Sequence, residues 1–131
     1  MGKSEFVNFR KGYILLMRND NKEKKMRYRL NVSDNSKNKR YLKEVMEEGG
    51  YELVISGLEE VDITIWDESY GIEAMMKNFS DDILCVCGDR VYNYLKRSNI
   101  DDRRNIKVIR RPFTGREMMN LVSEMLRPKM R

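Results

Sequence analysis

The segment that most constrains the fold of this chain is the apolar run ILCVC, residues 83–87. It stands between the polar pairs Asp81-Asp82 and Gly88-Asp89 and contains no polar residue. A strand with one wet face would alternate apolar and polar residues, whereas a continuous apolar run indicates burial on both faces. Such burial is typical of parallel sheets that are covered by helices on both sides. The run therefore predicts a central strand of an α/β domain.

The segments after this run alternate between helix and strand patterns. A helix is predicted over residues 90–98, a strand over residues 106–110 and a helix over residues 114–126. Thr114 precedes the last helix and Glu117 follows three residues later, which is the spacing of a capping box. The alternation predicts a doubly wound, mostly parallel sheet of five or six strands. With 131 residues, we expect a single domain over residues 1–131, in which residues 1–11 form a loose arm.

The front half of the chain has a less regular pattern. The apolar run YILLM (13–17) and the alternating segment MRYRLNV (26–32) are separated by a polar stretch too short for a crossover helix, so an N-terminal β-hairpin is expected. In the second strand the alternation places Tyr28 in the core. A helix over residues 37–50, capped by residues 33–36, would bury Leu42, Val45 and Met46. Two strands over residues 51–56 and 61–66 and a helix over residues 70–79 complete the prediction.

Composition excludes several classes of function. The chain has no histidine, and its two cysteines, Cys85 and Cys87, lie within the apolar strand, so we expect no metal site, no cofactor and no disulfide. No nucleophile with an adjacent base and no glycine-rich phosphate loop is present, and we do not expect an enzyme.

The start of the chain lacks an apolar signal, and no segment could span a membrane, so a cytoplasmic location without membrane contact is expected. The net charge of +5 comes from basic residues scattered among acidic ones.

Residues 82–126 resemble the back half of a response-regulator receiver domain. The closest motif is Arg111-Pro112-Phe113 at the end of a predicted strand, followed by the capped helix. Receivers carry a lysine, a proline and an aromatic residue there, and Arg111 takes the lysine position. The resemblance implies a flavodoxin-like fold with a site at the carboxyl ends of the strands.

In the receiver family that site holds an acidic pair after the first strand, a phosphoacceptor Asp after the third, a Ser or Thr after the fourth and the lysine after the fifth. The acids hold Mg²⁺, and the cations neutralise the phosphoryl oxygens. If residues 13–17 form the first strand, Asn19 and Asp20 replace the acidic pair. Cys87 or Gly88 stands at the Ser or Thr position, and Arg111 is not equivalent to lysine.

The acceptor position depends on which strand is the third, and two registers remain open. If residues 51–56 fill that role, the acceptor position is Gly57, which cannot be phosphorylated. If residues 61–66 do so, it is Asp67. Because either register lacks a complete metal site, we expect phosphorylation to be lost. Arg111 would then pair with an acid across the top of the sheet.

These observations favour a phosphorylation-independent, receiver-like signalling and protein-interaction module. In typical receivers the last strand and its flanking helices form the dimer or partner face, so a homodimer or a protein partner with an acidic surface is expected here. The basic residues of that candidate interaction face are Arg90, Lys96, Arg97, Arg103, Arg104, Arg110 and Arg116. Two alternatives stay open, a basic nucleic-acid-binding α/β domain and a residual receiver phosphorylated on Asp67.

Overall fold

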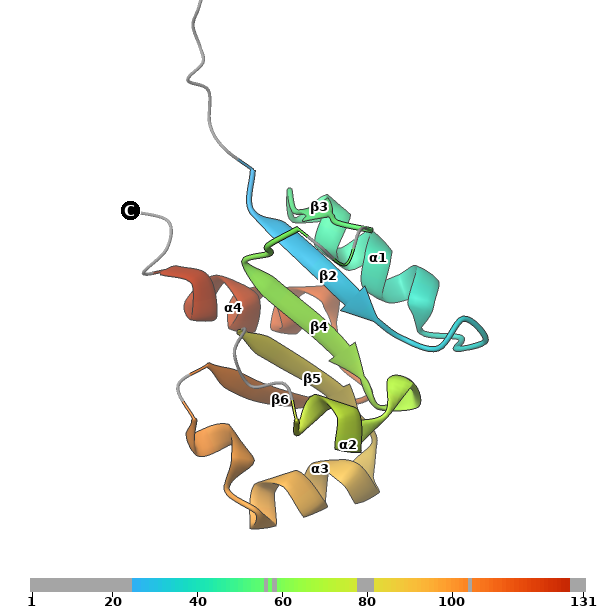
Figure 1. The fold of residues 1–131 in the computed structure, drawn as a ribbon, viewed down its shortest axis with the longest axis vertical. Helices are drawn as coiled ribbons and strands as arrows, with labels where there is room; N and C mark the ends of the chain where they lie inside the picture. Colours follow the sequence, from blue (N-terminus) through green and yellow to red (C-terminus); the bar gives the residue numbers. More distant parts are fainter. Residues whose placement is uncertain (1–24, 56, 58, 78–81, 104, 128–131) are drawn as a thin grey trace, which may run out of the picture.

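The computed structural model describes residues 25–55, 57, 59–77, 82–103 and 105–127. These residues contain a five-stranded sheet in the order β3-β2-β4-β5-β6, in which every neighbouring pair is parallel (Figure 1). The predicted α/β class with a doubly wound parallel sheet is confirmed. The strands are β2 (Arg27–Asn31), β3 (Glu52–Leu53), β4 (Ile63–Asp67), β5 (Ile83–Cys87) and β6 (Ile106–Arg110).

Helices cover both faces of this sheet. One face carries α1 (Lys39–Glu48) and α4 (Gly115–Leu126), and the other carries α2 (Ile72–Met75) and α3 (Asp89–Arg97), as Figure 1 shows. Two short 3₁₀ helices, η1 (Glu68–Tyr70) and η2 (Ile100–Asp102), follow β4 and α3. Within the described part of the chain, no helix is long and apolar enough to cross a membrane.

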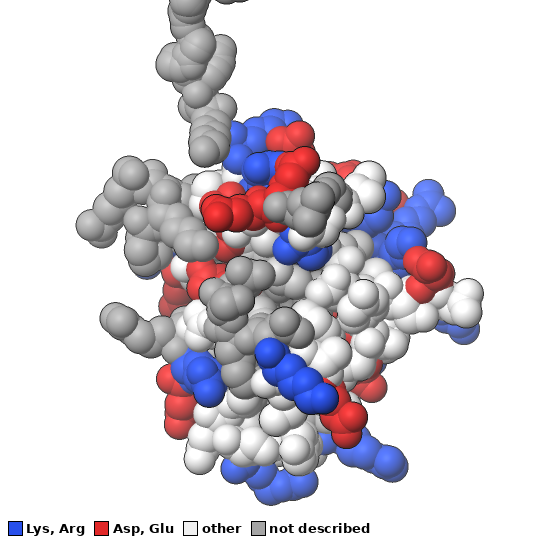
Figure 2. All heavy atoms as spheres, viewed as in Figure 1, with Lys and Arg blue, Asp and Glu red and all other residues white. Residues whose placement is uncertain are grey.

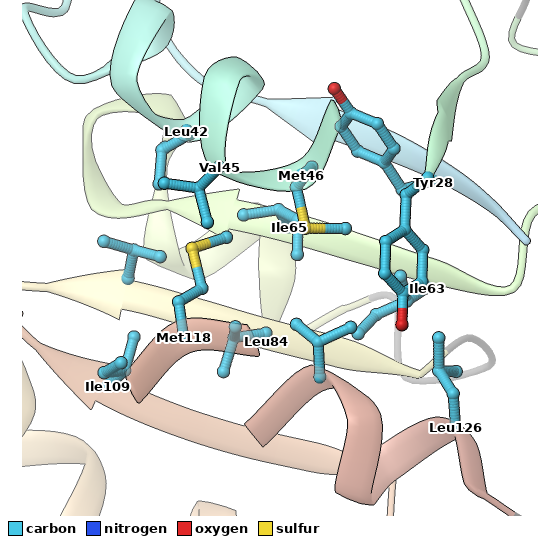
Figure 3. Packing of buried hydrophobic residues seen from close by; sticks show 13 residues of the cluster. Tyr28, Leu42, Val45, Met46, Ile63, Ile65, Leu84, Ile109, Met118 and Leu126 are labelled. Atoms are coloured by element: carbon cyan, nitrogen blue, oxygen red, sulfur yellow. The ribbon is translucent and has the colours of Figure 1, made fainter. Parts of the chain in front are cut away.

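The larger core cluster lies between the sheet and the pair α1 and α4 (Figure 3). Leu42, Val45 and Met46 of α1 are buried there, as their spacing predicts. Met118, Val122 and Leu126 are the buried residues of α4. Burial of a large apolar side chain contributes about 1.5–3 kcal/mol, so this layer accounts for much of the stability of the fold.

The smaller cluster lies on the opposite face, beneath α2 and α3. It contains Trp66 of β4, Met75 of α2, Cys85 and Cys87 of β5 and Leu95 of α3, among others. All five residues of β5 are buried, and so are all five of β4. The interpretation of the ILCVC run as a central strand buried on both faces is therefore confirmed.

The last helix begins as its sequence predicts. Thr114 Oγ1 accepts a hydrogen bond from the Glu117 N–H, and Glu117 Oε1 accepts one from the Thr114 N–H at 2.7 Å. This reciprocal capping box fixes the exit from β6 into α4.

Several local predictions are wrong. The strand expected over residues 51–56 is reduced to Glu52–Leu53, and the helix expected over residues 70–79 is described only as the single turn Ile72–Met75 after η1. The residue between η1 and α2, Gly71, has a φ of 121°, a conformation outside the helical region, and separates the two turns. The pattern of the helix predicted over residues 90–98 places Val91, Tyr94 and Leu95 inward, but Tyr94 is 47% exposed. None of the capping side chains expected from residues 33–36 caps α1, whose N-cap is Asn38 without a side-chain bond.

The front of the domain differs from the expected hairpin. The segment 13–17 and the arm 1–11 lie outside the described residues. Strand β2, which was expected to pair with that segment, instead lies between β3 and β4 and is parallel to both. Tyr28 on β2 is fully buried, as the alternation predicts. Strand β2 therefore lies inside the sheet and is the first strand of the described fold.

Candidate functional site

The chain reverses its direction of winding between the neighbouring strands β2 and β4. From β2 it passes through α1 outward to β3, and from β4 it continues through β5 to β6 on the other side. In open α/β sheets the carboxyl ends of the strands at such a switch point form the usual ligand site. Asp67 ends β4 at this edge, and Arg111 follows β6.

The Asp67 carboxylate is almost completely buried and fully engaged. It is 1% exposed. Its Oδ1 accepts a hydrogen bond from Arg111 Nη1 at 3.1 Å and another from Asn38 Nδ2 at 3.4 Å. Its Oδ2 accepts from the Ser69 N–H at 3.0 Å, which caps η1. A buried carboxylate is costly unless it is paired and hydrogen-bonded, and these contacts meet both conditions.

A second carboxylate lies on the other side of the same guanidinium. Glu68 Oε1 is 3.6 Å from Arg111 Nη2 and accepts a hydrogen bond of 2.6 Å from the Gly88 N–H. Gly88 is the N-cap residue of α3 and has no capping side chain of its own. Glu68 thus supplies the negative charge that the start of α3 favours. Glu68 therefore connects the loop after β4 with the start of α3 and with Arg111, which follows β6.

The strand order decides between the two registers that the sequence left open. The order β3-β2-β4-β5-β6 corresponds to the flavodoxin-like order 2-1-3-4-5, so β4 is the third strand and β3 the second. Asp67 therefore lies at the carboxyl end of the third strand, opposite Arg111. Gly57 follows the edge strand β3, which is separated from β4 by β2.

The first strand of that order is β2, so the position of the acidic pair lies after it. Ser33 and Asp34 stand there. The Ser33 N–H donates to Ser69 Oγ at 3.1 Å, whereas the Asp34 side chain is 94% exposed and pairs with Lys39. Asn19 and Asp20, which the sequence suggested for this position, lie outside the described residues. Their assignment depended on residues 13–17 being the first strand, and β2 holds that place.

Cys87 ends β5 at the position where receivers carry a hydroxyl. It is fully buried, and its thiol donates to the Ile109 carbonyl at 3.8 Å. A hydrogen bond with Cys87, together with burial, raises the pKa of the Cys85 thiol far above its ordinary value. Both side chains serve the core between the sheet and α3, and neither donates a hydrogen bond to the Asp67 carboxylate.

The residues at this edge do not fit the Mg²⁺ site of a receiver. Mg²⁺ requires several oxygen ligands in octahedral geometry. Asp67 is already occupied by Arg111, Asn38 and the Ser69 N–H, and Asp34 is directed to solvent beside Lys39. Among the described residues no group of three acidic or cysteine side chains lies close enough to hold a metal ion.

Two contributors to the site, Asn38 and Ser69, were not predicted from the sequence. Asn38 precedes α1 and Ser69 lies in η1, and only the fold brings them together at the Asp67 carboxylate. Glu68 could be suspected because it follows Asp67 at a strand end, although an isolated acid in a loop is more often solvated. The indole N–H of Trp66, which precedes Asp67 in β4, donates to the Gly71 carbonyl at 2.9 Å.

The candidate interaction face is distributed over several elements. Arg90 and Arg97 are exposed on α3, Arg103 follows η2, Arg110 ends β6 and Arg116 is exposed on α4, while Arg104 lies outside the described residues. Lys96 forms an ion pair with Asp101 at 2.5 Å, and Arg110 forms one with Asp89 at 3.5 Å.

Comparison with known proteins supports the fold. No family model matches the chain, and no curated protein matches it. A solved structure that does match is the crystal structure of a response regulator receiver protein from Burkholderia phymatum, with a TM-score of 0.59 and 15% sequence identity. The match covers 78% of this chain and 95% of that chain. The fold is therefore receiver-like, and at this level of identity the likeness concerns the fold alone.

Proposed function

We propose that this chain is a receiver-like signalling module that acts through protein contacts and without phosphorylation. The observation that carries the proposal is the pairing of Arg111 with two carboxylates of its own chain, Asp67 and Glu68. In a phosphorylated receiver the corresponding cation would neutralise phosphoryl oxygens. Here both sides of the guanidinium already face negative charge.

The state of Asp67 supports the same conclusion. A nucleophilic carboxylate must present a lone pair to an incoming phosphoryl group, and metal ions and cations must neutralise that group. Asp67 is 1% exposed, each of its oxygens accepts a hydrogen bond, and the neighbouring residues do not make a Mg²⁺ site. Loss of phosphorylation leaves the packing of the domain intact, because function in such folds resides in sites placed on a stable scaffold.

The Glu68 carboxylate also supplies the negative charge that a phosphoryl group would otherwise bring to Arg111. Its carboxylate holds both the Gly88 N–H and Arg111, so the loops after β4, β5 and β6 are joined without any added ligand. The module is therefore proposed to be constitutively in one conformation, with signalling through the surface of α3, β6 and α4. A protein partner with an acidic surface or a second copy of the chain would bind there.

The test is exposure of the full chain to acetyl phosphate and to beryllofluoride, each with Mg²⁺. We expect no phosphate adduct in the intact mass and no change in the amide spectrum around Asp67. Asp67→Asn is the matched control, since it keeps the size of the side chain and removes the nucleophile. An adduct that forms on the natural chain and disappears in Asp67→Asn would overturn the proposal.

The same experiment examines the second candidate, a residual receiver phosphorylated on Asp67. Its support is the place of Asp67 at the carboxyl end of the third strand, opposite a cation. The double variant Glu68→Gln with Arg111→Lys removes the tethered carboxylate and restores the ammonium. Labelling that appears only in this variant would indicate that Glu68 and Arg111 block the reaction in the natural chain.

Nucleic-acid binding has weaker support. Stacking on a base requires an exposed aromatic ring beside cations, and Tyr28, which lies between Arg27 and Arg29 in the sequence, is fully buried. On the face in Figure 2 the basic and acidic side chains are interspersed. The absence of salt-dependent binding to mixed-sequence DNA and RNA at low ionic strength would dismiss this alternative.

A further inference from the structure

A groove with a volume of about 670 Å³ lies along the outer edge of the sheet, between α3 and α4. Its floor is strand β6, including Val108 and Arg110, and its walls include Tyr92 of α3 and Leu121 of α4, with Phe113 at one end. The volume lies in the range of about 300–1,000 Å³ that is usual for binding sites.

The floor of the groove presents backbone groups that none of the described strands pairs with. The Asn105 carbonyl accepts from the Ile83 N–H, and the Arg111 N–H donates to the Cys87 carbonyl at 2.8 Å. In a parallel ladder the groups of alternate residues point to the same side, so Lys107 and Ile109 bond to β5 while Val108 and Arg110 point outward. Among the strands that the structure describes, none pairs with this outer side of β6. An open edge of this kind is a template for another strand.

The two walls of the groove differ in chemistry. On the α3 side the ring of Tyr92 has two cations near it, Arg110 Cζ at 5.1 Å and Lys96 Nζ at 5.6 Å from its centroid. On the α4 side, Leu121 and Phe113 are partly buried apolar residues that border the larger core cluster. Glu117 also lines this groove, and its carboxylate accepts the capping-box hydrogen bond from the Thr114 N–H.

The cations on the α3 side can change partners at low cost. The ion pair between Arg110 and Asp89 has a separation of 3.5 Å, and the two side chains are 53% and 79% exposed. Exposed pairs of this kind contribute about 0–1 kcal/mol. An acidic side chain placed beside Tyr92 would therefore find Arg110 available.

We propose that this groove binds an extended peptide segment of a partner protein, which adds to the open edge of β6 as a further strand. Successive side chains of a strand point to opposite faces, so alternate residues of the peptide would face the cationic α3 wall and the apolar α4 wall. The ligand is therefore a segment in which acidic and apolar residues alternate. Main-chain bonds to Val108 and Arg110 give affinity, and the two walls give specificity. This inference rests on the proposed interaction function and specifies how the partner binds.

The test uses the full chain and three short synthetic peptides. In the first peptide Glu alternates with Val, in the second Lys replaces Glu, and the third has the composition of the first with its Glu and Val residues in two separate blocks. We expect the first to bind about tenfold more tightly than either of the others and to slow amide exchange at Val108 and Arg110. No binding, equal binding of the block peptide, or slowed exchange at other sites would overturn the proposal.

Two variants at one position separate the backbone from the charge. Arg110→Ala removes the guanidinium and keeps the N–H, whereas Arg110→Pro removes both. Proline is tolerated on edge strands where the N–H faces outward. We expect Arg110→Ala to weaken binding modestly and Arg110→Pro to weaken it by about a further tenfold, which corresponds to about 1.4 kcal/mol. Equal affinities for the two variants would contradict strand addition.

If Arg110→Pro does not fold, the amide-exchange experiment on the natural chain decides alone. Val108 and Arg110 amides that are already protected without peptide would show that this chain or a second copy covers the edge, and that would overturn the proposal. Failure of the proposed function is distinguishable, because an acetyl phosphate adduct on Asp67 would be detected whether or not peptide binds.

Discussion

Arg110 and Arg111 are neighbours in sequence but belong to two regions of opposite character. The Arg111 side chain is 30% exposed and lies between Asp67 and Glu68 at the carboxyl edge of the sheet. The Arg110 side chain is 53% exposed and lies over Tyr92 in the groove beside β6. Arg111 is paired with two carboxylates of its own site, whereas Arg110 faces solvent and has a weak ion pair with Asp89.

Under the proposed function, the difference explains how a receiver-like scaffold would lose phosphorylation chemistry and keep a surface for a partner. At the carboxyl edge a buried charge requires complete pairing, and the pairing occupies the groups that a phosphoryl group would use. In the groove, solvent screens the charges, so a weakly paired cation costs little free energy. Cations and backbone groups there can therefore bind a partner. Burial, more than residue type, assigns the two regions their roles.

The largest expected effect is on Arg111. Arg111→Ala leaves the Asp67 carboxylate buried without its cation, and we expect a loss of about 3 kcal/mol in the free energy of unfolding. Arg110→Ala is the matched control and should change that free energy by less than about 0.5 kcal/mol, because its pair is exposed. Urea denaturation of both variants at neutral pH measures the difference.

The variant Arg111→Lys refines this comparison. It keeps the charge but cannot reach Asp67 and Glu68 with two separate nitrogens, so its stability should lie between those of the natural chain and Arg111→Ala. Equal losses for Arg110→Ala and Arg111→Ala would refute the contrast between a committed and an available arginine.

The next effect concerns the buried hydroxyl of Tyr28, which contrasts with the fully paired carboxylate of Asp67. Tyr28 is fully buried, and its hydroxyl has no hydrogen-bond partner among the described residues. Burial, with the Glu47 charge as a smaller cause, raises the pKa of Tyr28 from 10.0 to about 12. Between those values the unfolded chain loses the Tyr28 proton while the folded chain retains it. Stability is therefore fully present below pH 10 and is lost as pH rises toward 12.

We expect this loss to reach about 2 kcal/mol and to be absent in Tyr28→Phe. At neutral pH the same variant should be at least as stable as the natural chain, because it removes an unsatisfied buried hydroxyl. The difference between the two unfolding curves across this range isolates Tyr28 from the other groups that titrate there. An equally steep alkaline loss in Tyr28→Phe would show that the pKa of Tyr28 is the same in the folded and the unfolded chain, and that solvent reaches its hydroxyl.

The sequence predicted most of the back half of the fold and less of the front half. The run ILCVC and the capped helix after Phe113 carry strong local signals, since apolar periodicity and capping chemistry determine those elements. The edge strand β3 is described over two residues, and α2 over a single turn. Elements so short depend on tertiary packing, which no local pattern encodes.

The candidate site was predictable only in part. Arg111 followed from the motif before Pro112, whereas Asp67 remained one of two choices because the identity of the third strand depends on the strand order. The sequence favours residues 13–17 as the first strand, since their continuous apolar run is a stronger strand signal than the basic, alternating β2. The partners Asn38 and Glu68 come from loops whose meeting depends on the completed sheet.

A smaller effect is expected for Glu68. Glu68→Ala removes the acceptor of the Gly88 N–H and one of the two carboxylates beside Arg111, and we expect a loss of about 1 kcal/mol. Glu68→Gln keeps an oxygen that can accept from Gly88, so its loss should be smaller. Thermal unfolding of the two variants against the natural chain distinguishes them. A larger loss for Gln than for Ala would indicate that Glu68 is not held at the start of α3.

The smallest expected effect belongs to the exposed pair near the groove, Lys96 and Asp101. A hydrogen bond from Lys96 lowers the pKa of Asp101, opposed by desolvation. A carboxylate with a lowered pKa in the folded state adds stability above its unfolded value of 3.8, and that stability is lost as pH falls through the folded value. Lys96→Ala should reduce this loss of stability at low pH by less than about 1 kcal/mol, because solvent screens the pair. An effect as large as that of Arg111→Ala would show that Lys96 is paired as strongly as Arg111. It would contradict the contrast between the two regions.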